Sequence, residues 1–166
     1  MAEFLIAFRH TIAAEGGYCN DPLDRGGETK YGISKRSYPD VDIENLTLGT
    51  AAEIYCRDFW DRLKLSEIHQ QAIANELFDT AVNCGIGTAG RFVQVALNML
   101  SVSGGLLAVD GIVGMRTILA INSYRHPFSL LKTLNGLQFE RYHDIIKADP
   151  GQKKWFRGWL NRVWEV

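Results

Sequence analysis

A glycine-rich segment near the N-terminus constrains the fold of this 166-residue chain more than any other feature. Residues 16–33, GGYCNDPLDRGGETKYGI, hold five glycines and Pro22, with turn signals at residues 20–22 and 24–27. Such clusters end helices, and the residues between two turns can pair as a short, irregular hairpin. No other stretch has convincing β character. The sequence therefore predicts a mainly α fold, of the α+β type, with one small N-terminal β-hairpin.

The rest of the chain carries apolar residues at helical spacing. Phe4, Phe8 and Ile12 mark a first helix that ends at the glycine pair. Thr47 opens a second helix, and a Thr-x-x-Glu pattern at residues 50–53 supports its start. We expect the helices at residues 2–15, 47–63, 73–85, 92–100, 117–124, 127–145 and 155–164.

Composition and charge exclude several classes of protein. Hydrophobic residues make up 46% of the chain and charged residues 22%, which is the balance of an ordinary globular domain. The formal net charge is -1, so no global basic field attracts nucleic acid. No apolar run approaches the ~20 residues that a membrane span needs. We expect a monomer that binds no nucleic acid and has no stable membrane insertion.

The cysteines and histidines form no recognisable site. Cys19, Cys56 and Cys84 are odd in number and unrelated in spacing, and zinc-ligand spacing is absent from the sequence. The four histidines are scattered, so we expect no metal site. The first residues lack the basic start and long apolar run of a signal peptide. We therefore expect three free thiols in a protein that is synthesised in the cytoplasm.

Glu15 is the candidate for acid chemistry, because it lies where the first helix meets the glycine-rich segment. The negative end of the helix dipole disfavours an ionised carboxylate there, and burial in a cleft acts in the same direction. Asp24 follows nine positions later and Thr29 five after that. A hairpin can fold both side chains back toward the helix end, and glycines permit the close approach of a sugar.

Three motifs resemble a known family. The stretch EGGYCNDPLDRGGETKYGIS is similar to the opening motif of glycoside hydrolase family 108, the N-acetylmuramidase-type endolysins of phages and bacteria. The stretch FDTAVNCG at residues 78–85 also resembles this family. VDGIVGMRT at residues 109–117 resembles the Asp-Gly-x-x-Gly-x-x-Thr signature of peptidoglycan-binding regions. Together the likeness covers nearly the whole chain.

This resemblance implies a lysozyme-like fold, no cofactor, and cleavage of the β-1,4 bond between N-acetylmuramic acid and N-acetylglucosamine. By the same resemblance Glu15 is the general acid, while Asp24 and Thr29 position or activate water. Thr29 comes one residue sooner after the aspartate than in phage lysozymes. A glycine-rich loop between the two carboxyl groups favours the ~6.5–9.5 Å gap of inverting enzymes, so we expect inversion. Release or export must then deliver the enzyme to the cell wall, in the periplasm or outside.

The resemblance also gives domain boundaries and sugar-binding candidates. We expect a single lysozyme-like domain over residues 1–166, with a catalytic half at 1–88 and a helical half at 89–166 that resembles a peptidoglycan-binding region. Its partner is the peptidoglycan glycan strand. Tyr18, Asn20, Tyr31 and Asn83 are candidates for substrate binding, although tyrosines in a short strand also pack, and Asp79 with Asn83 can instead tie a helix to the hairpin.

The sequence leaves two questions open. The aromatic residues Trp155, Trp159 and Trp164 interleave with basic residues, which suits either packing or attraction to anionic wall polymers. The alternatives to a muramidase are a non-catalytic wall-binding or secretion-accessory protein, a lytic transglycosylase and a chitinase-type hydrolase.

Overall fold

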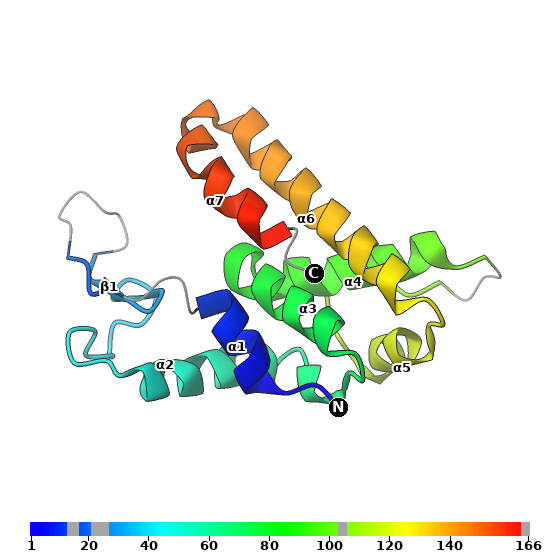
Figure 1. The fold of residues 1–166 in the computed structure, drawn as a ribbon, viewed down its shortest axis with the longest axis horizontal. Helices are drawn as coiled ribbons and strands as arrows, with labels where there is room; N and C mark the ends of the chain where they lie inside the picture. Colours follow the sequence, from blue (N-terminus) through cyan, green and yellow to red (C-terminus); the bar gives the residue numbers. More distant parts are fainter. Residues whose placement is uncertain (13–16, 21–26, 103–105, 164–166) are drawn as a thin grey trace.

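The computed structural model describes residues 1–12, 17–20, 27–102 and 106–163 (Figure 1). Within them the chain forms seven α-helices and a two-stranded antiparallel sheet. The elements in chain order are α1 Phe4–Ile12, β1 Thr29–Lys30, β2 Ile33–Ser34, α2 Leu48–Tyr55, a π-helix η1 Cys56–Trp60, a 3-10 turn η2 Leu65–Glu67, α3 Gln71–Cys84, α4 Ile86–Leu100, α5 Met115–Ser123, α6 Pro127–Ala148, a 3-10 turn η3 Pro150–Gln152 and α7 Lys153–Val163.

The predicted hairpin is present, and its turn lies at the end of the glycine-rich segment. Lys30 pairs with Ile33 across Tyr31 and Gly32, whose φ angles are 51° and 74°. Positive φ at both central residues gives the sharp turn that suits the twist of two paired strands. Gly32 has a second reason to be glycine, because a Cβ atom there would collide with the Tyr55 hydroxyl. On the other side, Cys19 forms a single antiparallel bridge with Thr29.

The second helix starts as predicted but is capped by one threonine only. The Thr47 side chain accepts a hydrogen bond from the Thr50 backbone N–H at 3.1 Å. The predicted Thr-x-x-Glu pattern at residues 50–53 lies inside the helix and is not its cap. After Tyr55 the helix widens into the π-helical turn η1, and turns continue the chain to Lys64.

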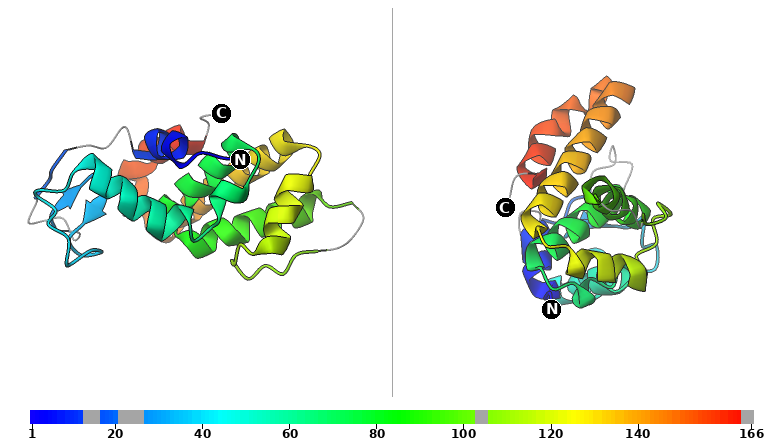
Figure 2. Two further views of the ribbon diagram at one scale, coloured as in Figure 1. Left: turned by 90° about the horizontal axis from the view of Figure 1, so that it is seen from below. Right: turned by 90° about the vertical axis from the view of Figure 1, so that its right-hand side faces the viewer.

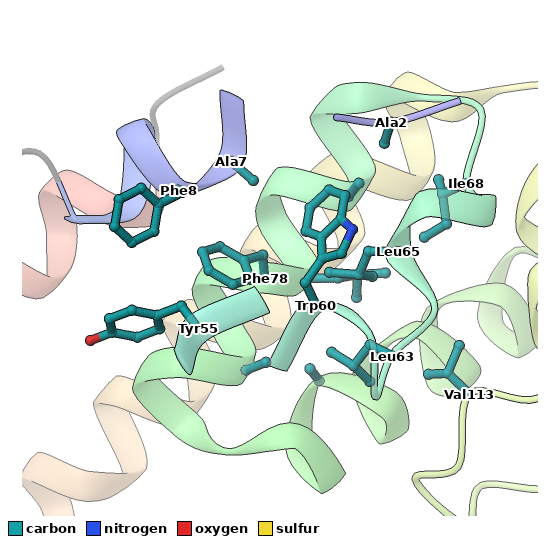
Figure 3. Close-up of a cluster of buried hydrophobic side chains, with 14 of the residues drawn as sticks. Ala2, Ala7, Phe8, Tyr55, Trp60, Leu63, Leu65, Ile68, Phe78 and Val113 are labelled. Atoms are coloured by element: carbon teal, nitrogen blue, oxygen red, sulfur yellow. The ribbon is translucent and has the colours of Figure 1, made fainter. Parts of the chain in front are cut away.

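Helix α3 is the centre of the molecule and contacts α1, α4 and α6. An aromatic cluster packs between α3, α1 and the α2–η1 segment (Figure 3). Trp60 is 1% exposed and Phe78 is fully buried, with their rings 5.9 Å apart in an edge-to-face arrangement. Large rings bury 150–250 Å² each and dominate core energetics. This cluster fixes the end of α1 relative to α2.

The C-terminal half is a second set of helices built on α3 and α4. Gly85 (φ 93°) ends α3, and α4 begins at once at Ile86, earlier than the predicted Phe92. Pro127 starts α6 as predicted. Helices α6 and α7 form an antiparallel pair that projects from the body (Figure 2). The Tyr142 and Trp159 rings stack 5.1 Å apart between them, so Trp159 has a packing role. No helix in the described ranges is long and apolar enough to cross a membrane.

Candidate active site

Tyr55 connects the middle of α1 and the hairpin turn in one framework. Its ring lies 5.8 Å from the Phe8 ring of α1, and its hydroxyl donates a hydrogen bond to the Tyr31 backbone oxygen at 3.1 Å. Because Tyr55 is only 3% exposed, both contacts are shielded from water. The segment that connects α1 to β1 therefore starts and finishes on elements that share one buried side chain.

The two carboxyl groups predicted to do the chemistry, Glu15 and Asp24, lie outside the described residues. Thr29, the third predicted catalytic residue, begins β1 and is half-buried. Its backbone N–H and C=O both bond to Cys19, at 2.8 and 2.9 Å. Its hydroxyl donates to the Gly27 carbonyl at 3.2 Å. The backbone of Thr29 is thus fixed on the hairpin, and its role toward water stays a prediction.

The predicted sugar-binding residues fall into two groups. Tyr18 and Asn20 are exposed on the hairpin, where the Asn20 side-chain amide donates to the Tyr18 hydroxyl at 3.4 Å. Tyr31 is half-buried in the turn and packs against the core. Asn83 is on α3, and its amide donates to both the backbone oxygen and the carboxylate of Asp79. Asn83 thus bonds within α3, and Asp79 bonds to Gln138 of α6 and Arg162 of α7, so the printed bonds of this pair tie α3 to these helices and not to the hairpin as the alternative predicted. Sugar binding by all four residues stays a prediction.

A pocket of about 750 Å³ opens between the hairpin turn and the junction of α3 with α4. Within it the Tyr38 hydroxyl donates to Asp58 at 3.0 Å, and Arg57 binds the same carboxylate at 2.7 Å through two nitrogens. The hydrogen bonds from Arg57 lower the pKa of Asp58, while desolvation raises the pKa of Tyr38 to about 12. Asp58 is therefore held as a carboxylate and suits charge stabilisation better than proton donation. The lining residues are Gly32, Ile33, Ser37, Tyr38, Tyr55, Asp58, Phe59, Arg62, Val82, Gly85 and Ile86.

A second polar group lies on the opposite side of α3 and was not predicted. Arg162 of α7 donates to the Asp79 carboxylate at 2.9 Å and to the Thr11 carbonyl of α1 at 3.4 Å. Gln138 of α6 donates to the other Asp79 oxygen at 2.9 Å. Glu76, one turn before Asp79, is 7% exposed.

Thr11, Glu76, Asp79 and Arg162 line a pocket of about 350 Å³ between α1, α3, α6 and α7. Desolvation, followed by repulsion from Asp79, raises the pKa of Glu76 to about 8, although a hydrogen bond from Thr80 opposes the rise. A sequence signal existed in part, because Glu76, Asp79 and Asn83 recur on one helix face. Their partners Gln138 and Arg162 are 59 and 83 residues away from Asp79, and helical spacing cannot reveal such pairs.

Comparison with known families assigns both halves of the chain. Residues 8–85, which span α1 to α3, match the family model described as Glycosyl hydrolase 108. The N-terminal half belongs to glycosyl hydrolase family 108. Residues 88–164, from α4 to α7, match the model described as Predicted Peptidoglycan domain. A glycosyl hydrolase 108 segment joined to a peptidoglycan domain makes this chain a hydrolase that acts on peptidoglycan.

A solved structure supports the fold independently. The chain is similar to "Structure of Brucella abortus SagA", with a TM-score of 0.74 over 96% of this chain and 88% of that chain. The two sequences are 21% identical, so this likeness shows the fold alone. The predicted mainly α, lysozyme-like fold with a small hairpin is confirmed. Among curated proteins, none matches the chain significantly.

Proposed function

We propose that this family 108 hydrolase is an N-acetylmuramidase that cleaves the β-1,4 bond between N-acetylmuramic acid and N-acetylglucosamine. Glu15 is the general acid, and Asp24 and Thr29 hold or activate the attacking water. The single observation that carries this proposal is the Tyr55 framework. It ties Phe8, in the middle of α1, to the hairpin turn, and the Glu-Gly-Gly-Tyr to Asp-x-Gly-Gly-x-Thr motif lies on the stretch of chain that joins these two elements.

The family supplies the reaction class, and the chain supplies the residue types that this class needs. A glycosidase needs one protonated carboxyl group for the leaving oxygen and a second polar centre for water or the cationic ring. Among the carboxyl groups near the hairpin, Asp58 is kept ionised by Arg57 and so does not suit the acid role. Glu76 has a raised pKa but is 7% exposed and lines the separate pocket between α1, α3, α6 and α7. The resemblance to the family motif is what assigns the acid role to Glu15.

The domain organisation follows from the same proposal. We place the catalytic half at residues 1–88 and the peptidoglycan-binding half at 89–166, in one lysozyme-like unit that acts as a monomer. Since the substrate lies outside the membrane, the enzyme reaches the wall by release or export, as a phage-type endolysin does.

Replacement of the acid tests the proposal directly. Glu15→Gln keeps the size of the side chain but cannot donate a proton, and loss of general acid assistance costs ~10²–10⁴ in rate. Lysis of purified peptidoglycan should fall by that factor, while the melting temperature stays that of the wild type. The matched control is Glu3→Gln on the exposed start of the chain, which should lyse normally. A Glu15→Gln enzyme with more than a small fraction of wild-type activity would refute the assignment.

The products separate a muramidase from its rivals. Mass spectrometry of the released muropeptides should show reducing ends on N-acetylmuramic acid, whereas a transglycosylase forms an anhydro product. We also expect inversion, because Asp24 and Glu15 are separated by a glycine-rich loop that leaves room for a water. NMR of the first-formed product should show the α-anomer. An initial β-anomer would show retention and exclude the water-mediated route.

A further inference from the structure

Exposed apolar side chains concentrate in one part of the peptidoglycan-domain half. Of the fifteen large apolar side chains that are exposed in the described ranges, seven fall in residues 99–119. A single exposed apolar residue is ordinary. One of the seven, Val102, also lines a pocket. The seven are Met99, Val102, Leu106, Val109, Ile112, Met115 and Leu119.

A pocket of about 460 Å³ opens in this region, between the end of α4 and the end of α5. Its volume lies in the range of small-molecule sites. Aliphatic side chains from α4, α5 and the segment between them supply the floor, including Leu97, Leu107 and Ala120. Tyr124, Arg125 and His126 form one rim, where the Tyr124 and His126 rings meet edge to face at 6.0 Å.

Hydrogen bonds hold two neutral polar side chains, Asn98 and Ser123, in the wall of this pocket. The Asn98 amide donates to the Leu107 carbonyl at 2.9 Å and accepts from the Leu107 N–H at 2.8 Å. The Ser123 hydroxyl donates to the Ala120 carbonyl at 3.4 Å. These bonds fix Asn98 and Ser123 in the pocket wall, while Asn98 keeps one further amide N–H and Ser123 keeps its acceptor oxygen.

The lining also contains a positively charged hydrogen-bond donor, Arg125. Arg125 is exposed and has no ion-pair or hydrogen-bond partner among the described residues. The lining contains no aspartate or glutamate. A guanidinium with five N–H donors next to an aliphatic hollow is suited to a ligand that combines a carboxylate with small apolar groups.

We propose that this pocket binds the peptide stems of peptidoglycan, with Arg125 on a stem carboxylate and the aliphatic floor against alanine methyl groups. The proposal rests on the match to a peptidoglycan domain and names the part of the polymer that this domain holds. A glycan strand presents N-acetyl amides and hydroxyls but no free carboxylate, so it offers no ion-pair partner to Arg125. The carboxylates of the polymer and its alanine methyl groups belong to its peptides.

Binding to an uncleavable probe tests this site without any dependence on catalysis. The full-length chain, labelled with 15N, is titrated with a synthetic stem pentapeptide that ends in two D-alanines. We expect backbone shift changes centred on Tyr124, Arg125 and His126. Arg125→Ala should weaken the affinity about tenfold or more, since a hydrogen bond to a charged group is lost, and Arg125→Lys should weaken it less. Arg116→Ala removes an exposed arginine of α5 outside the lining and should bind as the wild type does.

Binding of a different ligand in this pocket would overturn the proposal. A chitooligosaccharide that shifts the same residues while the pentapeptide does not would make the pocket a glycan site. Binding to vesicles of anionic phospholipid without any pentapeptide binding would make it a lipid patch. Equal affinities of the Arg125→Ala and Arg116→Ala variants would remove Arg125 from the site. Because the probe contains no glycosidic bond, an inactive Glu15→Gln enzyme that still binds the pentapeptide would leave this proposal intact.

Discussion

Two clusters of side chains, here called joints, pack other elements against α3. One consists of aromatic rings and the other of polar groups. The aromatic joint consists of Phe4, Phe8, Tyr55, Trp60 and Phe78 and packs α3 against α1 and the α2–η1 segment. The polar joint consists of Glu76, Asp79, Gln138 and Arg162 and packs α3 against α6 and α7. Apart from Phe4, the first lies within residues 8–85, which match the glycosyl hydrolase model. The second connects that segment to the peptidoglycan domain.

The two joints differ in how their stability responds to a change of pH or to the loss of one partner. Rings gain stability from burial and shape, which no change of pH removes. Buried charges instead depend on having every partner in place, because an unpaired ion in the interior is costly. In the polar joint Gln138 is fully buried, and its side-chain oxygen has no hydrogen-bond partner within the described part of the chain. The polar joint is therefore the one whose stability is more sensitive to pH.

The largest effect is expected in the aromatic joint. Phe78→Ala deletes a fully buried ring in contact with Phe4, Tyr55 and Trp60. Deletion of such a ring lowers the free energy of unfolding by about 3–5 kcal/mol through lost burial and the cavity left behind. Urea denaturation followed by circular dichroism measures this loss. Phe128→Ala on α6, where the side chain is 57% exposed, is the matched control and should cost less than about 1 kcal/mol.

A smaller effect is expected when the ion pair of the polar joint is broken. The side chains of Asp79 and Arg162 are 13% and 19% exposed. Arg162→Met leaves the Asp79 carboxylate without its cation, which costs about 3–5 kcal/mol for a fully buried pair and about 2 kcal/mol with this residual exposure. The same denaturation experiment measures it. Arg157→Met, an exposed arginine on the same helix, should leave stability within about 0.5 kcal/mol of the wild type.

A double-mutant cycle decides whether the pair itself is responsible. Asp79→Asn combined with Arg162→Met removes both charges, so the double variant should be more stable than the sum of the two single losses implies. Strict additivity would mean that Arg162 stabilises through its aliphatic stem or through Thr11, and the polar joint would then lose its ionic character.

The aromatic joint could be predicted from the sequence more readily than the polar joint. Phe4, Phe8 and Ile12 recur at helical spacing, so the apolar face of α1 was predictable, as were the Thr47 cap, the end of α3 at Gly85 and the start of α6 at Pro127. These are local signals. The start of α4 was missed, because a helix that follows a glycine without any loop has no separate initiation signal. The π-helical turn at Cys56–Trp60 has no recognised signature either.

The polar joint depends on partners that are distant in the sequence. Arg162 has the appearance of a solvent-facing arginine in a basic terminal helix, and only the docking of α7 onto α3 reveals its contact with Asp79. Glu76 likewise has the composition of a helix surface residue. For the proposed catalytic residues, the sequence is more informative than the structure. Motif spacing singles out Glu15 and Asp24, whereas the described structure contributes only the framework on either side of them.

The last prediction uses pH to separate the joints. Desolvation, followed by repulsion from Asp79, raises the pKa of Glu76 from its ordinary value of 4.5 to about 8 in the folded chain. Between these two values the folded state binds one proton more than the unfolded state. Stability therefore falls as pH rises from about 4.5 to about 8, by at most about 1.4 kcal/mol per pH unit. Above that window both states are ionised and the dependence ends.

Glu76→Gln removes this titration while keeping the size of the side chain. The difference in unfolding free energy between Glu76→Gln and the wild type should grow in favour of the variant as pH rises through the window. Asp79, whose charge helps to raise the pKa of Glu76, lines the same pocket and is present in both proteins. Phe78→Ala should instead lower stability equally at every pH, since no charge changes in the aromatic joint. A Glu76→Gln difference that stays flat from pH 5 to pH 8 would show that water or a counter-charge stabilises the Glu76 carboxylate, and the polar joint would then be no more sensitive to pH than the aromatic one.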